Sequence, residues 1–327
     1  MKYNFRFNLL FFVLLISIFS CNNAKNAGEF SNESKKETIR VFHAGSMSVP
    51  MKEIAASFKS SHQNVEILLE SAGSRTCARK ITDLKKECDL MVSADYTVID
   101  NLLIPDFAKW NIKFASNEMV IAFTEKSKRN TEINADNWYE ILLDKNVAFG
   151  RSEPNSDPCG YRSVLTVKLA EKYYNNEQII KLLDKDVNYI RPKEVDLLGL
   201  LDINAIDYIF IYLSVAKQHK LNYIILPDQI NLKNPEFTDL YNSVTVKISG
   251  KKPNKFITKT GEPMIYGLTI PDNSQNQKLA LEFVEFFLSS KNGMAIIEKD
   301  GQESVIPSVS DSYSFIPDRL KKFAKPQ

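Results

Sequence analysis

Short apolar segments alternate with amphipathic segments along the chain from about residue 38. Residues 38–42, 65–69 and 89–92 are rich in β-branched and other apolar side chains, which predicts strands. Residues 49–60 and 78–86 carry apolar side chains at helical spacing, which predicts helices between the strands. Strands that alternate with helices form mostly parallel sheets, which bind ligands at the carboxyl ends of their strands. The pattern therefore predicts an α/β fold with its site at these strand ends.

The length of 327 residues suggests two lobes rather than one core. An apolar strand at residues 118–124 is interpreted as the crossing into the second lobe, and residues 266–270 as the return crossing. We therefore expect lobe I to comprise residues 38–120 and 266–327, and lobe II to comprise residues 121–265.

The rest of the pattern is less regular. An apolar helix is expected at residues 277–289, one strand at 244–248 in a loop-rich stretch, and a loosely held polar tail at 311–327. Within lobe II, further strands are predicted at residues 147–149, 187–190, 208–212 and 223–226, and helices at 164–170 and 197–201.

The N-terminus has the pattern of a secretion signal. Residues 9–19 are apolar, but about eleven residues are too few to span a bilayer, and Lys2 and Arg6 precede them. The following Ile-Phe-Ser-Cys resembles a bacterial lipobox, which implies that residues 1–20 are removed and that Cys21 is acylated. An ordinary signal peptide with an incidental cysteine is the alternative. Residues 21–37 are polar and predict a flexible tether, so we expect a protein held by its lipid at the outer face of the cytoplasmic membrane or in the periplasm.

Charge and cysteine content exclude several classes of protein. The net charge is only +2 and no long basic run occurs, which argues against a nucleic-acid partner. No Cys/His spacing typical of zinc sites is present. With Cys21 acylated, at most one disulfide can form among the three remaining cysteines, which are Cys77, Cys88 and Cys159. Cys77 and Cys159 are interpreted as buried structural residues.

The first two predicted strands end in the same tripeptide, Ala-Gly-Ser. Gly45 and Ser46 belong to the first copy, and Gly73 and Ser74 to the second. Glycine permits a close backbone approach to a ligand, and the amides at the start of the following helix favour an anion. Two such turns on neighbouring strands face one crevice, which predicts a small-anion site because no nucleotide-binding loop is present. A third junction offers the hydroxyl of Ser93, although a plain turn explains it equally well.

Lobe II contributes two acidic candidates at the ends of predicted strands. Asp157 precedes a helix, where capping is its default role, and Glu194 follows the next strand in a loop that also contains Asp196. Tyr212 ends a strand and can extend its hydroxyl to the anion, whereas Arg162 either balances charge near the loop or pairs with a surface acid. The basic side chains after the second turn are interpreted as solvated, with steering of anions as the alternative: Arg75, Arg79 and Lys80.

Five ordered motifs together resemble one family, the tungstate/molybdate-binding proteins of ABC importers. The similarity extends from about residue 38 to 310, and the motifs are Val-Phe-His-Ala-Gly-Ser at 41–46, Ser-Ala-Gly-Ser at 71–74, Ser-Ala-Asp-Tyr at 93–96, Asp-Pro-Cys-Gly-Tyr-Arg-Ser at 157–163 and Arg-Pro-Lys-Glu at 191–194. The resemblance implies a class II periplasmic-binding-protein fold whose two lobes, joined by crossing strands, close on one oxyanion.

The same resemblance implies how the ligand is held. Four oxo groups and two carboxylate oxygens surround the metal, and the carboxylates match Asp157 and Glu194, while the Ala-Gly-Ser turns bind the oxo groups. This chain lacks an insertion common in the family between these two motifs, so Asp196 competes with Glu194 as the second ligand. The resemblance also implies an ABC permease as partner, a monomer, no cofactor and binding without turnover.

The paired acids favour tungstate or molybdate on chemical grounds. A carboxylate repels sulfate or phosphate in a desolvated cleft, whereas a molybdenum or tungsten centre accepts further oxygen ligands. Binding of another tetrahedral oxyanion and an anion-sensing receptor remain the alternatives. A secreted hydrolase that uses Ser46 or Ser74 with His43 is disfavoured because no Gly-x-Ser-x-Gly motif occurs.

Overall fold

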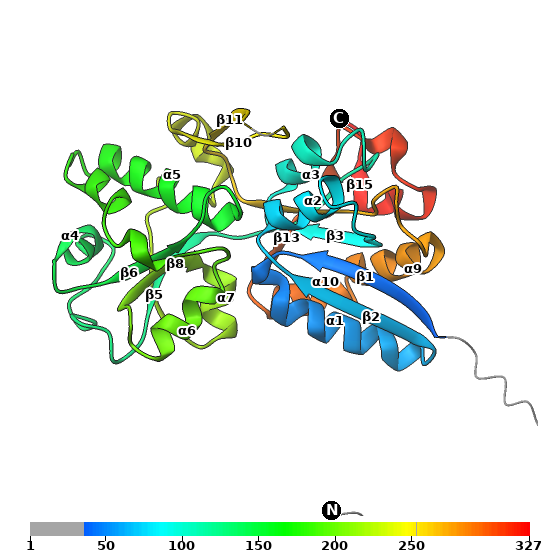
Figure 1. Cartoon of the computed structure of the whole chain (residues 1–327), viewed down its shortest axis with the longest axis horizontal. Coiled ribbons are helices and arrows are strands. Elements are labelled where there is room, and N and C mark those ends of the chain that lie inside the picture. The colour runs from blue at the N-terminus through cyan, green and yellow to red at the C-terminus, as the bar shows by residue number, and fades with distance from the viewer. Residues whose placement is uncertain (1–35, 253) are drawn as a thin grey trace, which may run out of the picture. The chain divides into compact units, whose positions relative to one another are not determined.

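Two mixed sheets, each flanked by helices, carry the fold (Figure 1). The computed structural model describes residues 36–252 and 254–327, and residues 36–327 form one compact unit. We call the elements around the six-stranded sheet lobe I and those around the five-stranded sheet lobe II. The predicted signal peptide, the acylation of Cys21 and the tether up to residue 35 lie outside the described residues.

The sheet of lobe I has the strand order β13-β4-β12-β3-β1-β2. The three predicted strands, β1, β2 and β3, pair in parallel, whereas β12 pairs in antiparallel fashion with both β3 and β4, and β13 with β4. The first three strands are β1 (Glu37–His43), β2 (Val65–Ser71) and β3 (Leu90–Ser93). The others are β4 (Ile112–Ser116), β12 (Ile265–Thr269) and β13 (Glu303–Ser304). The sheet is therefore more mixed than the alternating pattern suggests.

Helices cover both faces of this sheet (Figure 1). They are α1 (Ser48–Ser61), α2 (Ser74–Thr82), α3 (Tyr96–Leu102), α9 (Gln277–Leu288) and α10 (Gly293–Lys299). The helix predicted at residues 78–86 begins at Ser74 instead, directly after the second Ala-Gly-Ser turn. It ends at Thr82, and the chain turns back at Lys85, whose φ is 52°. The buried apolar face of α1 is the predicted one, with Met51, Ile54 and Phe58 fully enclosed.

The sheet of lobe II has the order β7-β6-β8-β5-β9. Its strands are β5 (Met119–Phe123), β6 (Phe149–Ser152), β7 (Ile190–Arg191), β8 (Tyr208–Tyr212) and β9 (Asn222–Ile225). Its helices are α4 (Trp138–Leu143), α5 (Pro158–Tyr173), α6 (Asp196–Asp202) and α7 (Leu213–Gln218).

The strand predicted at 187–190 is mostly wrong, because Val187–Tyr189 forms a 3-10 helix. Asp186 starts this helix in a left-handed conformation, with φ 57°, and its carboxylate accepts a hydrogen bond from the Phe149 amide at 3.0 Å.

The chain crosses between the lobes twice. Residues 117–118 connect β4 of lobe I to β5, which lies inside the sheet of lobe II between β8 and β9. Residues 261–264 lead back into β12, between β3 and β4 of lobe I. Asn117 ties the two crossings together, since its amide donates to the hydroxyl oxygens of Ser214 and Tyr266 at 2.7 and 3.1 Å.

A β-hairpin occupies the stretch that was predicted as loop-rich with one strand. β10 (Thr245–Ser249) pairs in antiparallel fashion with β11 (Phe256–Thr260). Sequence patterning missed β11 because its sequence, Phe-Ile-Thr-Lys-Thr, shows no alternation of apolar and polar side chains. The hairpin lies beside α5, where Lys168 donates to the Thr245 carbonyl oxygen at 2.6 Å, and Figure 1 shows it between the two lobes. We therefore count it with lobe II.

The prediction of a loosely held tail at residues 311–327 is wrong. β15 (Ala324–Lys325) pairs with β14 (Ser308–Val309), and two 3-10 helices, Tyr313–Phe315 and Asp318–Phe323, precede it. Ile316 and Leu320 are buried in the main core. Most of their neighbours in the sequence are polar, so the apolar pattern does not predict their burial.

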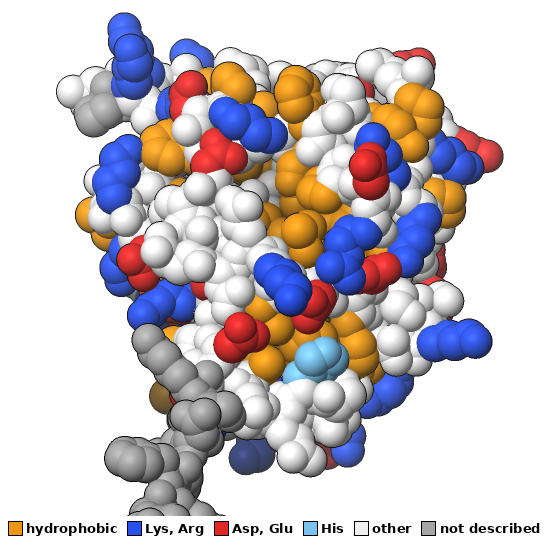
Figure 2. Space-filling model, turned by 90° about the vertical axis from the view of Figure 1, so that its right-hand side faces the viewer, with side chains coloured by type: hydrophobic (Ala, Val, Ile, Leu, Met, Phe, Trp, Pro, Cys, Tyr) orange, Lys and Arg blue, Asp and Glu red, His pale blue; other side chains and the backbone are white. Residues whose placement is uncertain are grey.

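The surface carries charges of both signs. Figure 2 shows acidic and basic side chains interspersed with apolar ones across the end of lobe I, without an extended patch of one sign on the described residues in view. No helix within residues 36–252 or 254–327 combines the length and the apolar character needed to cross a membrane.

Candidate functional site

The two Ala-Gly-Ser turns lie side by side at one end of the lobe I sheet. The ends of β1, β2 and β3 are in register, with His43 paired to Ser71 on one side and to Val92 on the other. The amide of Ala44 donates to the Val92 carbonyl oxygen at 2.9 Å, and that of Ala72 to the His43 carbonyl oxygen at 3.1 Å. The two turns are therefore neighbours at the strand ends, as the sequence predicted.

The first turn approaches Glu194 of the other lobe. A Cβ atom placed on Gly45 would lie 2.7 Å from Glu194 Oε2, so only glycine leaves room for this carboxylate. The hydroxyl oxygen of Ser46 accepts a hydrogen bond from the Tyr266 hydroxyl at 3.0 Å, and Ser46 is fully buried. Glu194 thus faces the start of the helical turn that follows β1.

The second turn approaches Asp157 in the same way. A Cβ atom on Gly73 would lie 2.4 Å from the Ser156 carbonyl oxygen and 3.0 Å from the Asp157 Cβ. The hydroxyl oxygen of Ser74 accepts a hydrogen bond from the Ala94 amide at 2.9 Å. Each of the two turn glycines therefore meets one of the two acidic loops of lobe II.

Asp157 caps α5, as its position before the helix predicted. Its Oδ1 accepts a long hydrogen bond from the Cys159 amide at 3.4 Å, and its Oδ2 accepts one from the Glu194 amide at 3.0 Å. Asp157 is 1% exposed, and this burial raises the pKa of its carboxyl. Its second contact joins the two acidic loops directly.

Glu194 is fully buried, and neither of its carboxylate oxygens has a hydrogen-bond partner among the described residues. Burial and the neighbouring charge of Asp157 raise the pKa of its carboxyl well above the ordinary value. Buried acceptors without a partner are rare in folded proteins, and the Ser46 backbone and the Asp157 carboxyl lie beside this carboxylate, so Glu194 is a candidate for a ligand contact. Asp196, the competing candidate, forms an ion pair with Lys193 at 3.6 Å and has a side chain that is 35% exposed.

Two other predicted site residues have partners within the protein. The hydroxyl of Ser93 donates to the Asp95 carbonyl oxygen at 2.6 Å, so its proton is used within its own turn. The hydroxyl oxygen of Tyr212 accepts a hydrogen bond from Arg162 at 3.0 Å, which leaves the proton of Tyr212 available. The structure therefore gathers both turns, both acids and Tyr212, while Ser93 offers no free donor.

Basic side chains near the site are deeply buried. Arg162 is 2% exposed and donates to the Ala94 carbonyl oxygen of lobe I at 2.7 Å, so a pairing with a surface acid does not occur. Arg75, interpreted from sequence as a solvated helix charge, is 1% exposed, which corrects that interpretation. Arg79 pairs with Asp83 at 3.4 Å and remains partly exposed, as predicted.

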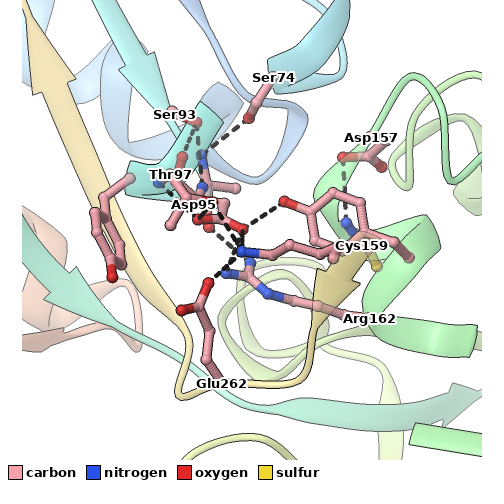
Figure 3. A network of polar contacts seen from close by, with 12 residues as sticks. Ser74, Ser93, Asp95, Thr97, Asp157, Cys159, Arg162 and Glu262 are labelled. Carbon is pink, nitrogen blue, oxygen red and sulfur yellow. Dashed lines mark hydrogen bonds and ion pairs between the residues drawn. The ribbon is translucent and has the colours of Figure 1, made fainter. Parts of the chain in front are cut away.

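An ion-pair network, drawn in Figure 3, lies next to the acidic loops and joins the two lobes. Asp95 of lobe I accepts a hydrogen bond from the Tyr161 hydroxyl at 2.5 Å. It also forms ion pairs with Lys259 at 3.0 Å and with Arg162 at 3.6 Å. Burial alone would raise the pKa of Asp95, but these two cations hold it well below its ordinary value. Lys259 also pairs with Glu262.

Sequence reasoning found only part of this network. Asp95 falls in the third junction, where the sequence analysis predicts a role only for Ser93. Lys259 is separated from Asp95 by more than half of the chain, and no local pattern signals their contact.

All three cysteines in the described part of the chain are buried and unpaired. Burial raises the pKa of the Cys77 thiol to about 12, and the pKa of Cys159 is also raised well above its ordinary value. The interpretation of Cys77 and Cys159 as buried structural residues is therefore confirmed.

Comparison with known proteins identifies the family. Residues 39–303 match the family described as bacterial extracellular solute-binding protein. The chain belongs to this family. An uncharacterized solute-binding protein of Petrotoga mobilis is 48% identical over 289 residues, which cover 88% of this chain and 90% of the relative.

Another relative is named for its ligand. The molybdate/tungstate-binding protein WtpA of Thermococcus kodakarensis is 39% identical over 344 residues, covering 96% of this chain and 95% of the relative. The resemblance seen in the sequence motifs is thereby confirmed.

Solved structures of periplasmic binding proteins share the fold. The periplasmic molybdate-binding protein of Azotobacter vinelandii matches with a TM-score of 0.59 at 16% identity, over 82% of this chain and 99% of that one. The sulfate-binding protein SubI of Mycobacterium tuberculosis matches with a TM-score of 0.56 at 13% identity, over 89% of this chain and 92% of that one. These matches confirm the two-lobe α/β fold.

Proposed function

We propose that this solute-binding protein captures tungstate or molybdate between its lobes and delivers it to an ABC permease at the outer face of the membrane. The observation that carries the proposal is the pair of unpartnered Glu194 oxygens, buried opposite Gly45 and tied to Asp157 through the Glu194 amide. Relatives named as molybdate/tungstate-binding proteins support the choice of ligand.

The site combines donors for oxo groups with donors for a metal centre. The Ala-Gly-Ser turns of lobe I present amides at helix starts, which bind the negatively charged oxygens of an oxyanion. Asp157 and Glu194 of lobe II present carboxylate oxygens, which a tungsten or molybdenum centre accepts as further ligands. Sulfur and phosphorus do not expand their coordination in this way, so the two acids, when ionised, repel sulfate and phosphate.

Capture requires that the two halves of the site come together. The turns belong to lobe I and the acids to lobe II, so a complete ligand shell exists only when the lobes are closed. Residues 117–118 and 261–264 connect the lobes, and small rotations in such short connections suffice for hinge closure. The bound anion then leaves unchanged when the lobes open, without chemical turnover.

Titration calorimetry tests the proposed ligand. The chain without residues 1–21 is titrated with tungstate, molybdate and sulfate in turn. We expect tight binding of the first two and none of sulfate. Binding of sulfate or phosphate without a response to tungstate would mean that the acids serve only as caps and loop ties, and would favour another oxyanion as the ligand.

The lipid anchor is a separate part of the proposal. Acylation of Cys21 followed by a polar tether keeps the protein near its permease at the membrane. In detergent-phase partitioning, the full-length chain should enter the detergent phase and the Cys21→Ser variant the aqueous phase. Retention of the variant in the detergent phase would contradict the anchor.

A further inference from the structure

Arg75 is a buried cation that has no ion-pair partner in the described part of the chain. It directly follows the second Ala-Gly-Ser turn, in the first turn of α2, and is 1% exposed. It forms no ion pair with a carboxylate of residues 36–252 or 254–327, and burial lowers the pKa of its guanidinium. A buried charge normally has a charged partner, so this arrangement requires an explanation.

The acceptors of Arg75 are neutral and belong to two residues of lobe II: the Asn155 carbonyl, and the carbonyl and hydroxyl oxygens of Ser249. Its Nε donates to the Asn155 carbonyl oxygen at 3.1 Å, and its Nη2 donates to the Ser249 carbonyl oxygen. Asn155 precedes Asp157 in the loop after β6, and Ser249 ends β10 of the hairpin. The Asn155 side chain also accepts a hydrogen bond from the Ser249 amide at 2.8 Å, which joins the loop to the hairpin. Arg75 therefore has these acceptors only while the lobes are closed.

Three other cations in this part of the interface have carboxylate partners. Arg162 pairs with Asp95, and Lys259 pairs with Asp95 and with Glu262, as Figure 3 shows for part of the network. Arg79, one turn after Arg75 on α2, pairs with Asp83. Arg75 thus differs from these cations in having no ion-pair partner within the described residues, and the charge of Asp95 acts on it only from a distance.

Closure has opposite electrostatic consequences with and without a ligand. Closing the lobes removes the Arg75 guanidinium from water, and neutral carbonyl oxygens replace only part of its hydration. An oxyanion bound at the adjacent turn supplies the missing negative charge, and Coulomb attraction is strong in a water-poor interior. The cost of burying Arg75 therefore falls when the anion is present.

We propose that Arg75 is a positioning residue that makes lobe closure depend on the bound anion. It opposes closure of the empty protein and stabilises closure around an oxyanion, while it holds the loop that carries Asp157. This inference rests on the proposed function, because it takes the oxyanion site as given.

The test compares Arg75→Met with Arg79→Met in the chain that begins at residue 22. Methionine keeps the approximate length of the side chain and removes its charge. Arg79 is the matched control, because it also donates to the hairpin, at Ser249 Oγ and the Gly250 carbonyl oxygen, both at 3.0 Å, but has a carboxylate partner. Tungstate affinity is measured by calorimetry, and lobe closure by the change in radius of gyration in small-angle X-ray scattering when tungstate is added.

For Arg75→Met we expect tungstate affinity to fall by about tenfold or more, and the change in radius of gyration to shrink because the empty variant closes more readily. For Arg79→Met we expect both quantities to stay near the wild-type values. A merely structural role of Arg75 would lower the melting temperature without altering closure. Wild-type affinity in Arg75→Met, or equal effects of the two substitutions, would overturn the inference.

Arg75→Lys keeps the inference testable if the methionine variant does not fold. Lysine retains the charge but cannot span both acceptors with a rigid fork, so we expect a wild-type change in radius of gyration with faster release of tungstate in stopped-flow experiments. A wild-type release rate would overturn the role of the two hydrogen bonds. A failure of the wild-type protein itself to bind tungstate would instead contradict the proposed function.

Discussion

Glu194 and Gly45 come from different lobes, yet a Cβ atom on the glycine would lie 2.7 Å from the Glu194 carboxylate. This contact connects the amide-rich turn that suits an anion to a carboxylate with two unpartnered oxygens. Gly73 and the Asp157 loop repeat the arrangement. The site therefore consists of two similar contacts, in each of which a glycine turn of lobe I lies against an acidic loop of lobe II.

The glycine contact predicts a variant that folds normally but binds poorly. Gly45→Ala should lower tungstate affinity by about tenfold or more, because the methyl group displaces the Glu194 carboxylate from its position. The melting temperature without ligand should change little, since the clash arises between the lobes. Calorimetry and thermal unfolding measure both quantities.

Gly199→Ala is the matched control for this substitution. Gly199 lies within α6, and a Cβ atom there has no neighbour within 4 Å. Affinity should remain at the wild-type value, and stability should rise slightly because alanine favours the helix. Equal affinity loss in both variants would contradict the specific role of Gly45.

Asp157 has both a structural role and a proposed ligand role, and two substitutions separate them. Asp157→Asn keeps an oxygen that can cap α5, whereas Asp157→Ala loses the cap and the contact with the Glu194 amide. We expect both variants to bind tungstate weakly, and only the alanine variant to lose about 1–2 kcal/mol of unfolding free energy. Urea unfolding and calorimetry distinguish these effects, and full binding by Asp157→Asn would exclude ligation by the carboxylate.

His43 predicts a pH dependence of stability. Burial lowers the pKa of its imidazole from 6.5 to about 4, and Lys193 and Lys52 act in the same direction. The unfolded chain therefore binds a proton that the folded protein excludes, so stability falls as the pH drops from 6.5 to 4 and is complete above 6.5. The wild type should lose about 3 kcal/mol more than His43→Gln over this interval. Parallel pH profiles in urea unfolding would contradict this account.

The ordered C-terminus predicts a large effect from a residue far from the site. Leu320 is fully buried, so Leu320→Ala should lower the unfolding free energy by about 2–5 kcal/mol. Leu84→Ala serves as the control, because Leu84 is 65% exposed and should contribute little. A value near zero for Leu320→Ala would mean that the segment is loosely held after all.

Local chemistry explains why much of the site was predictable from sequence. Glycine and serine after an apolar strand specify a turn by themselves, and the strand register brings the two turns together. Asp157 and Glu194 likewise sit at strand ends, where a parallel arrangement collects functional groups.

Features that depend on distant parts of the chain were not predictable. The pairing of Asp95 with Lys259 and the burial of Arg75 under the hairpin both join segments far apart in the chain, which no local pattern encodes. The strand β11 was missed because its side chains lack an apolar alternation, and its buried residue is Lys259, which contacts Asp95. Such contacts follow from tertiary packing rather than from local preference.

The most direct test of the central claim is a calorimetric titration of the wild type, Glu194→Gln and Asp196→Asn with tungstate. Asp196 is the control, since its carboxylate is partly exposed and pairs with Lys193. The account predicts tight binding by the wild type and Asp196→Asn, and a loss of about a hundredfold or more in Glu194→Gln. Unchanged affinity in Glu194→Gln would contradict the claim that the two buried acids hold the metal centre.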